Sequence, residues 1–207
     1  MRFGYFDVDC RELSAEGAWI FRPRVLPIAA KVERLLDRAL SEDAPVVATT
    51  CGSGRMPDDR NCPGGLHVPM DPGSAAWETE VARHRSFHLQ KACGSWHTFD
   101  GNGNAGRLFG RLALRDWVVF GNGLDLCVDH VVTNLVGLGL SVTFLSDVLI
   151  PSAKGYGPDS ASGTEANRIA TLERWRNAGA VESDLESFLA ARQASWVPKG
   201  DFDRKGT

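Results

Sequence analysis

The chain has 207 residues, of which 43% are hydrophobic and 24% are charged, the balance of an ordinary globular protein with room for a sizeable core. Its net charge of -3 argues against a nucleic-acid or anionic-membrane partner, because both favour basic surfaces. No apolar run approaches the roughly 20 residues of a membrane span, and the sequence enters a predicted strand at Phe3 without a signal peptide. We therefore expect a single cytoplasmic domain over 1–207, with a mobile charged tail at 198–207.

The cysteine content fits a reducing compartment. The number of cysteines is odd and no C-x-x-C pair occurs, which favours free thiols over a disulfide framework. The five are Cys10, Cys51, Cys62, Cys93 and Cys127.

The first third of the chain alternates between strand and helix patterns. Residues 3–8 are apolar and β-prone, and this predicted strand ends at Asp7-Val8-Asp9. Residues 14–27 are predicted to form a loop that covers a pocket or packs on the sheet. A helical period follows over 28–40, and then a second strand at 46–48.

A long loop over 52–73 follows the second strand and is rich in Gly, Pro, Asp and Arg. Together, Cys51, Cys62 and His67 offer three possible zinc ligands, although their spacing is irregular and has no second pair. The alternative is a substrate-covering loop with reduced thiols.

The next elements are a short helix over 75–82, a strand over 86–91 that ends at Lys91, and a helix over 105–114. Residues 101–106 match G-x-G-x-x-G literally. A dinucleotide site needs a strand directly before this motif and an acid about 20 residues later, and both are missing. We therefore interpret the glycines as a turn.

Residues 117–146 form the unit around which the chain is organised. A buried strand at 118–120 is broken by Gly121-Asn122-Gly123, Asp125 is a good helix N-cap, and apolar residues at helical spacing continue to 135. The helix is followed by a strand at 142–145. Cys127 lies in the first turn of the helix, where free N–H groups and the helix dipole favour the reactive thiolate and stabilise an oxyanion. The alternative is an inert buried thiol.

After a flexible loop over 151–163, a helix from 164, a short strand at 180–181 and a helix from 185 complete the pattern. The alternation predicts an α/β fold of three layers, with a mostly parallel, Rossmann-like central sheet and helices on both faces. Carboxyl ends of parallel strands share one edge, so Asp7, Lys91 and Cys127 are expected to converge. There the carboxylate takes the proton of the thiol, and the thiolate attacks a carbonyl carbon.

Three motifs in this order resemble the isochorismatase-like cysteine hydrolases, a superfamily that includes nicotinamidases and N-carbamoylsarcosine amidases. The motifs are Phe6-Asp7-Val8-Asp9, Lys91 followed by Ser95-Trp96-His97-Thr98-Phe99, and Gly121-Asn122-Gly123-Leu124-Asp125-Leu126-Cys127-Val128. The resemblance covers most of the chain.

The resemblance implies an Asp7–Lys91–Cys127 catalytic triad that hydrolyses a C–N bond of a small-molecule amide or ureide through an acyl-enzyme on Cys127. It also implies a cis peptide at Asn122-Gly123, an oxyanion hole from the N–H groups of Gly123 and Cys127, no required cofactor and a homo-oligomer. The candidate pocket residues are Asp9, Leu13, Trp19, Trp96, Phe99 and Leu124.

The sequence also departs from the family pattern. The Asp-x-His with which nicotinamidases bind a metal is replaced by Thr49-Thr50-Cys51-Gly52-Ser53, and the metal set Cys51, Cys62 and His67 is an alternative. Asp9, Leu124 and His130 stand where Gln, a small hydroxyl residue and Thr are common. Two further functions stay open: an isochorismatase-type vinyl-ether hydrolase, which Cys127 disfavours, and a non-catalytic fold that binds a ligand or partner.

Overall fold

The computed structural model describes residues 2–13, 19–49, 65–73, 75–91, 97–100, 102–156 and 161–195. One seven-stranded sheet has the order β5-β6-β4-β1-β7-β8-β9, and every neighbouring pair in it is parallel. The predicted parallel sheet is therefore confirmed. Its strands are β1 (Phe3–Val8), β4 (Val46–Thr49), β5 (Leu66–Val68), β6 (Ser86–Leu89), β7 (Asp116–Asn122), β8 (Ser141–Ile150) and β9 (Val181–Ser183).

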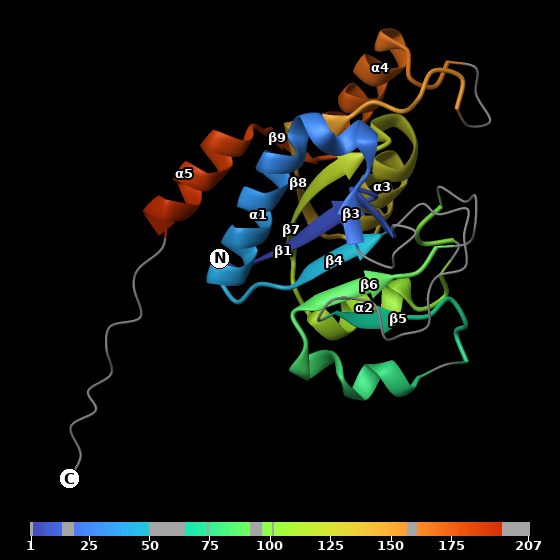
Figure 1. Cartoon of the computed structure of the whole chain (residues 1–207), viewed down its shortest axis with the longest axis vertical. Helices are drawn as coiled ribbons and strands as arrows, with labels where there is room; N and C mark the ends of the chain where they lie inside the picture. Colours follow the sequence, from blue (N-terminus) through green and yellow to red (C-terminus); the bar gives the residue numbers. More distant parts are fainter. Residues whose placement is uncertain are drawn as a thin grey trace.

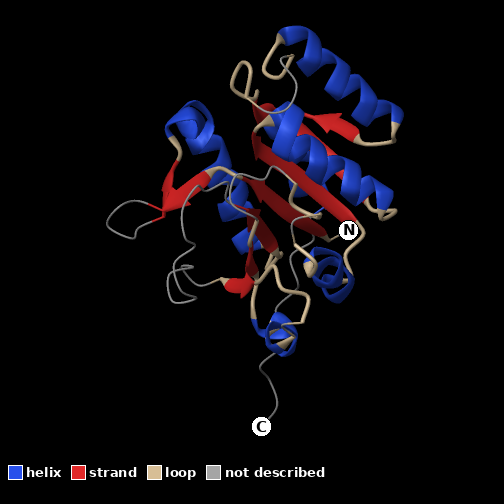
Figure 2. Ribbon diagram, turned by 90° about the vertical axis from the view of Figure 1, so that its right-hand side faces the viewer, coloured by secondary structure: helices blue, strands red, loops and turns tan. Residues whose placement is uncertain are grey.

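Helices cover both faces of the sheet (Figures 1 and 2). The 3-10 helix η1 (Pro23–Ile28), α1 (Ala29–Ser41) and α5 (Leu185–Ser195) share one apolar core, whereas α2 (Ala105–Leu112), α3 (Asp129–Gly137) and α4 (Glu165–Asn177) share the other. Strand β7 supplies both cores, because Trp117 and Val119 face one side and Val118 and Phe120 face the other. The predicted three-layer α/β/α arrangement is confirmed.

Three local predictions differ from the structure. The segment predicted as a loop over 14–27 contains β3 (Trp19–Phe21), which pairs antiparallel with β2 (Arg11–Leu13), because Trp19-Ile20-Phe21 is β-prone and the prolines instead start and continue η1. Strand β5 lies within the predicted loop over 52–73. The expected helix over 75–82 is two short 3-10 segments, η3 (Ala76–Thr79) and η4 (Val81–Arg83).

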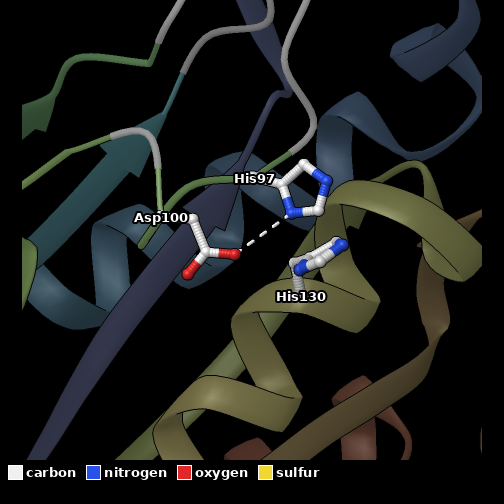
Figure 3. A group of neighbouring side chains, drawn as sticks. All are labelled: His97, Asp100 and His130. Carbon is white, nitrogen blue, oxygen red and sulfur yellow. Dashed lines mark ion pairs between the residues drawn. The ribbon is translucent and has the colours of Figure 1, made fainter.

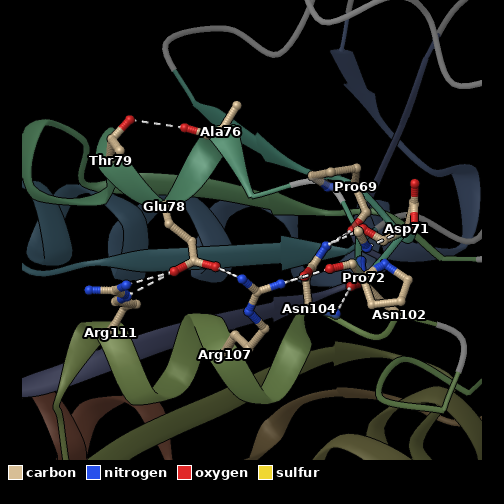
Figure 4. Close-up of polar contacts among 11 residues, drawn as sticks. Pro69, Asp71, Pro72, Ala76, Glu78, Thr79, Asn102, Asn104, Arg107 and Arg111 are labelled. Atoms are coloured by element: carbon tan, nitrogen blue, oxygen red, sulfur yellow. Dashed lines mark hydrogen bonds and ion pairs between the residues drawn. The ribbon is translucent and has the colours of Figure 1, made fainter.

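Residues 102–106 of the glycine-rich segment have a structural role (Figure 4). Asn102 Nδ2 donates hydrogen bonds to the carbonyls of Val68 and Gln90 at 3.1 and 2.8 Å. Asn104 Nδ2 likewise donates to two carbonyls of the segment that follows β5. These amides hold β5 and the end of β6 against the start of α2, in agreement with the interpretation of this motif as a turn and not as a dinucleotide site.

Some sequence-based expectations concern residues outside the described ranges. They include Cys51, Cys62, Cys93, Trp96 and the tail at 198–207. Along the described residues, no helix has the length and apolar character needed to cross a bilayer.

Candidate active site

Asp9 lies directly after β1 and is fully buried. Its backbone has a φ of +55°, a left-handed conformation that is uncommon for a residue with a side chain and that ends the strand. Thr49 Oγ1 donates a hydrogen bond to Asp9 Oδ1 at 3.0 Å, and the Asp9 N–H donates to the Thr49 carbonyl at 3.1 Å. The adjacent strand β4 therefore fixes both the backbone and the carboxylate of Asp9.

Lys91, two residues beyond the end of β6, donates to this carboxylate. Its Nζ lies 2.5 Å from Asp9 Oδ2, and neither side chain is exposed. A buried charge pair of this kind persists only with close geometry and further hydrogen bonds, which Thr49 supplies here. The expected lysine–carboxylate pair is present, but its carboxylate is that of Asp9.

Asp7, the acid that the sequence analysis assigned to this pair, lies at a different cavity. It lines a second cavity of about 330 Å³ beside Leu36 and Leu40 of α1. In a regular strand Asp7 and Asp9 would face the same side, but the left-handed backbone of Asp9 breaks that alternation. Burial raises the pKa of the Asp7 carboxyl, while its contacts with Cys10 and Arg11 only partly oppose this rise.

Cys127 lies in the turn of helix that joins β7 to α3. This turn, η5 (Leu124–Val128), has π-helical hydrogen bonding, with the Val128 N–H donating to the Gly123 carbonyl at 3.0 Å. Cys127 is 5% exposed, and it lines a cavity of about 280 Å³ together with Asp9. The fold thus brings the thiol and the Asp9 carboxylate to one cavity at the carboxyl ends of β1 and β7.

Two glycines shape the approach to the thiol. Gly121 has a φ of +134°, and a Cβ there would lie 2.1 Å from the Val8 carbonyl oxygen, so β1 and β7 approach closely only because this residue is glycine. Gly123 has a φ of +81°, and a Cβ there would lie 3.5 Å from Cys127 Sγ. The described residues contain no cis peptide, so the prediction of one at Asn122-Gly123 is wrong. The left-handed Gly123 makes the turn instead.

One of the two predicted oxyanion-hole donors, the Gly123 N–H, is engaged within the protein. The Gly123 N–H donates to the Ile150 carbonyl of β8 at 3.0 Å, so this donor is already engaged. The N–H groups of Leu126 and Val128 both donate to the Gly123 carbonyl. The N–H of Cys127, which lies in η5, stays a predicted donor to the oxyanion.

Asp125 connects η5 to the segment after β8 and to α4, and it does not act as the N-cap that we predicted. Its carboxylate accepts hydrogen bonds from the backbone of Ser152 and Gly163 and from the Asn167 side chain, at 3.0, 2.7 and 2.7 Å. Burial alone would raise the pKa of this carboxyl, but these hydrogen bonds outweigh burial and lower it. Asp125 therefore stays ionised and fixes the turn that carries Cys127.

The cavity has polar walls that the sequence analysis missed. Arg22 and Arg24 lie on it, and Arg24 Nη2 donates to the Pro151 carbonyl at 2.9 Å. Asn122 and Ser152 also line it, and within the described part of the chain Asn122 Oδ1 and Ser152 Oγ are buried without a hydrogen-bond partner. These atoms are suited to hydrogen-bond a polar ligand. The only sequence signal for these four polar residues is their position: Asn122 and Ser152 lie near strand ends, and Arg22 and Arg24 follow the short β2–β3 pair.

Two other predicted pocket residues, Leu124 and Phe99, do not line this cavity. Leu124 is 2% exposed within the core, and the Phe99 ring stacks on Phe109 at a centroid distance of 5.4 Å. Leu13 and Trp19 belong to β2 and β3, but the structure does not describe their side chains. Trp96 lies outside the described residues.

No model of a known protein family matches the sequence, and no curated protein matches it. Solved structures do match. A cysteine hydrolase from Pseudomonas syringae pv. phaseolicola has a TM-score of 0.60 at 13% identity, covering 94% of each chain. An isochorismatase from Pseudomonas putida has a TM-score of 0.59 at 15% identity, over 90% of this chain and 89% of that one. The nicotinamidase of Staphylococcus aureus has a TM-score of 0.57 at 14% identity, over 88% and 100%. The chain therefore has the isochorismatase-like fold.

Proposed function

We propose that this chain, which has the isochorismatase-like fold, is a hydrolase that cleaves a C–N bond of a small amide or ureide through an acyl-enzyme on Cys127. One observation carries the proposal: Cys127 and Asp9 line one cavity, and Asp9 is held by Lys91 at 2.5 Å. A thiol, a carboxylate and an ammonium group are thereby placed at the carboxyl edge of a parallel sheet, where ligands bind in such folds.

In the proposed reaction Asp9 accepts the proton of the Cys127 thiol, and Sγ attacks the carbonyl carbon of the substrate. The proposed donor that stabilises the tetrahedral oxyanion is the N–H group of Cys127. As the C–N bond breaks, Asp9 returns the proton to the leaving nitrogen. A water molecule, deprotonated by Asp9, then attacks the thioester carbon, which releases the carboxylic or carbamic acid and restores the thiol.

The walls of the cavity indicate the kind of substrate. The buried oxygens of Asn122 and Ser152 are placed to accept hydrogen bonds from an amide or ureido N–H group. Arg24 adds positive charge to the same cavity, which favours a substrate with a carboxylate. The charge of Arg22 is balanced by Glu12, whose Oε2 lies 3.3 Å from Arg22 Nε. A volume of about 280 Å³ suits a small molecule.

The test is the release of ammonia or amine from a panel of small amides and ureides, with and without a carboxylate, alongside isochorismate. We expect the parent chain to hydrolyse a carboxylated amide or ureide, to accumulate a Cys127 acyl adduct visible by mass spectrometry, and to lose turnover when Cys127→Ala is made. Turnover that survives this substitution would refute the acyl-enzyme. Turnover of isochorismate alone would favour the vinyl-ether reaction, and a folded chain with no turnover and no adduct would favour a binding protein.

A further inference from the structure

A second group of chemically reactive side chains lies outside the Cys127 cavity. His97 and Asp100 belong to one turn before α2, and His130 lies on the first turn of α3 (Figure 3). His97 Nδ1 lies 3.3 Å from Asp100 Oδ2, and the two imidazole rings have a centroid distance of 3.9 Å. One nitrogen or oxygen from each of the three residues lies within 4.8 Å of the others.

From this arrangement we propose that His97, Asp100 and His130 bind a divalent transition-metal ion of the zinc class. Two imidazoles and one carboxylate form a common ligand set for such ions. Zinc–ligand bonds of about 2.0–2.2 Å place ligand atoms about 3.4 Å apart around a tetrahedral ion. Small side-chain rotations therefore suffice to close the group on an ion.

The surroundings of the three residues suit an ion that enters from solvent. The side chains of His97 and Asp100 are 40% and 72% exposed, while His130 is half-buried. The half-buried imidazole gives a fixed ligand on a helix, and the exposed pair completes the set from the neighbouring turn. Three protein ligands leave at least one coordination position for water or another small ligand, as in zinc sites that are not purely structural.

The position of the site relates it to the nucleophile. His130 follows Cys127 by three residues and lies on α3, the helix that directly continues the turn carrying Cys127. The site is separate from the zinc set suggested by the sequence, which consists of Cys51, Cys62 and His67. It is also independent of the proposed hydrolase reaction, in which no step uses a metal.

Zinc binding to the untagged full-length chain tests the proposal. Equilibrium dialysis with Zn²⁺ should give one ion per chain, and Co²⁺ should give visible absorption bands that Zn²⁺ displaces. His97→Ala and His130→Ala should each weaken binding by at least about 10-fold, the loss that follows from removing even an indirect partner of a metal ligand. Asp100→Asn, at an exposed side chain that the fold does not require, should weaken binding in the same direction.

The matched control is His84→Ala, which removes another half-buried histidine outside the group and should leave the affinity unchanged. Circular dichroism verifies that each variant is folded. The proposal is overturned if the parent binds no stoichiometric ion, or if Asp100→Asn and the folded histidine variants bind as the parent does. It is equally overturned if binding is lost only in His67→Ala or Cys51→Ser, which would place the ion in the 51–67 segment.

Discussion

Lys91 Nζ lies 2.5 Å from Asp9 Oδ2, and both side chains are fully buried. The two residues are far apart in the sequence, and each follows the end of a different strand, β6 and β1. Ionised groups are expensive to bury, so their pairing at the edge that also carries Cys127 indicates a role that packing alone does not explain. Most of the following predictions test this pair and its surroundings.

The first prediction separates the two acids of β1. Asp9→Asn removes the proposed proton acceptor and should lower kcat by about 10²–10⁴-fold, the usual contribution of a general base. Asp7→Asn is the matched control, because Asp7 lines the other cavity, next to α1, and kcat should stay close to that of the parent. Steady-state hydrolysis of the best substrate from the amide panel measures both. A loss of turnover in Asp7→Asn, with Asp9→Asn active, would restore the original assignment of Asp7.

The second prediction concerns stability. Lys91→Met leaves the buried Asp9 carboxylate without its cation, and breaking a buried pair in this way costs about 3–5 kcal/mol in the free energy of unfolding. Adding Asp9→Asn removes the stranded charge, so the double variant should recover part of this loss. Urea denaturation at pH 7 of the parent, both single variants and the double variant gives the coupling energy. A double variant no more stable than Lys91→Met would contradict a buried charge pair.

The third prediction concerns the choice of substrate. Arg24 donates to the neutral Pro151 carbonyl at the cavity, so its charge is suited to a substrate carboxylate. Arg24→Gln should raise KM for the carboxylated substrate by about 10-fold, in line with a hydrogen bond to a charged group. Its effect on kcat and on a neutral amide should be small. Arg83→Gln, at an exposed arginine on η4, is the control. Equal KM changes for charged and neutral substrates would show that Arg24 acts only through its hydrogen bond to Pro151 and does not bind the substrate carboxylate.

The architecture and the position of Cys127 could be predicted from the sequence more readily than the acid that pairs with Lys91. Strands and helices follow from side-chain periodicity, which is a local property, and so the layers and the place of Cys127 at the start of α3 were predictable. Side-chain periodicity does not distinguish Asp7 from Asp9, because residues two apart in a regular strand face the same side. Only the left-handed backbone at Asp9, which depends on contacts with β4, separates them.

Other features depend on contacts between distant segments. Asp is a preferred N-cap residue type, which led to the prediction for Asp125. Its hydrogen-bond partners instead lie in the segment between β8 and α4 and in α4 itself. Likewise, His97 and His130 carry no recognisable metal spacing in the sequence, and the fold brings them together across two elements. Such contacts have no local signature, which explains why sequence periodicity identifies the sheet but not these side-chain groups.

The fourth prediction is a pH dependence of stability. Burial, followed by the nearby His67, lowers the pKa of His88 to about 4, below the ordinary value of 6.5. Between these pH values the unfolded chain binds a proton at His88 that the folded chain excludes, so the free energy of unfolding falls as pH falls, by about 1.4 kcal/mol per pH unit.

His88→Gln removes this contribution and should reduce the slope of unfolding free energy against pH between 6.5 and 4. The comparison with the parent isolates His88, because Asp7, whose pKa burial raises, acts in the opposite direction in both proteins. Urea denaturation across this range measures the slopes. Equal slopes of unfolding free energy against pH for parent and variant would mean that His88 binds its proton as readily in the folded chain as in the unfolded chain.

The last prediction tests the close approach of β1 and β7 that positions Asp9. A Cβ at Gly121 would lie 2.1 Å from the Val8 carbonyl oxygen, at a backbone φ of +134° that side chains disfavour. Gly121→Ala must therefore push the strands apart at the residue before Asp9, and it should lower the free energy of unfolding by more than about 3 kcal/mol. Gly106→Ala is the matched control, because a Cβ there meets nothing within 4 Å and lies in α2. Alanine is the better helix former and should add up to about 1 kcal/mol. Urea denaturation compares the two, and a Gly121→Ala protein as stable as the parent would contradict the approach of the strands.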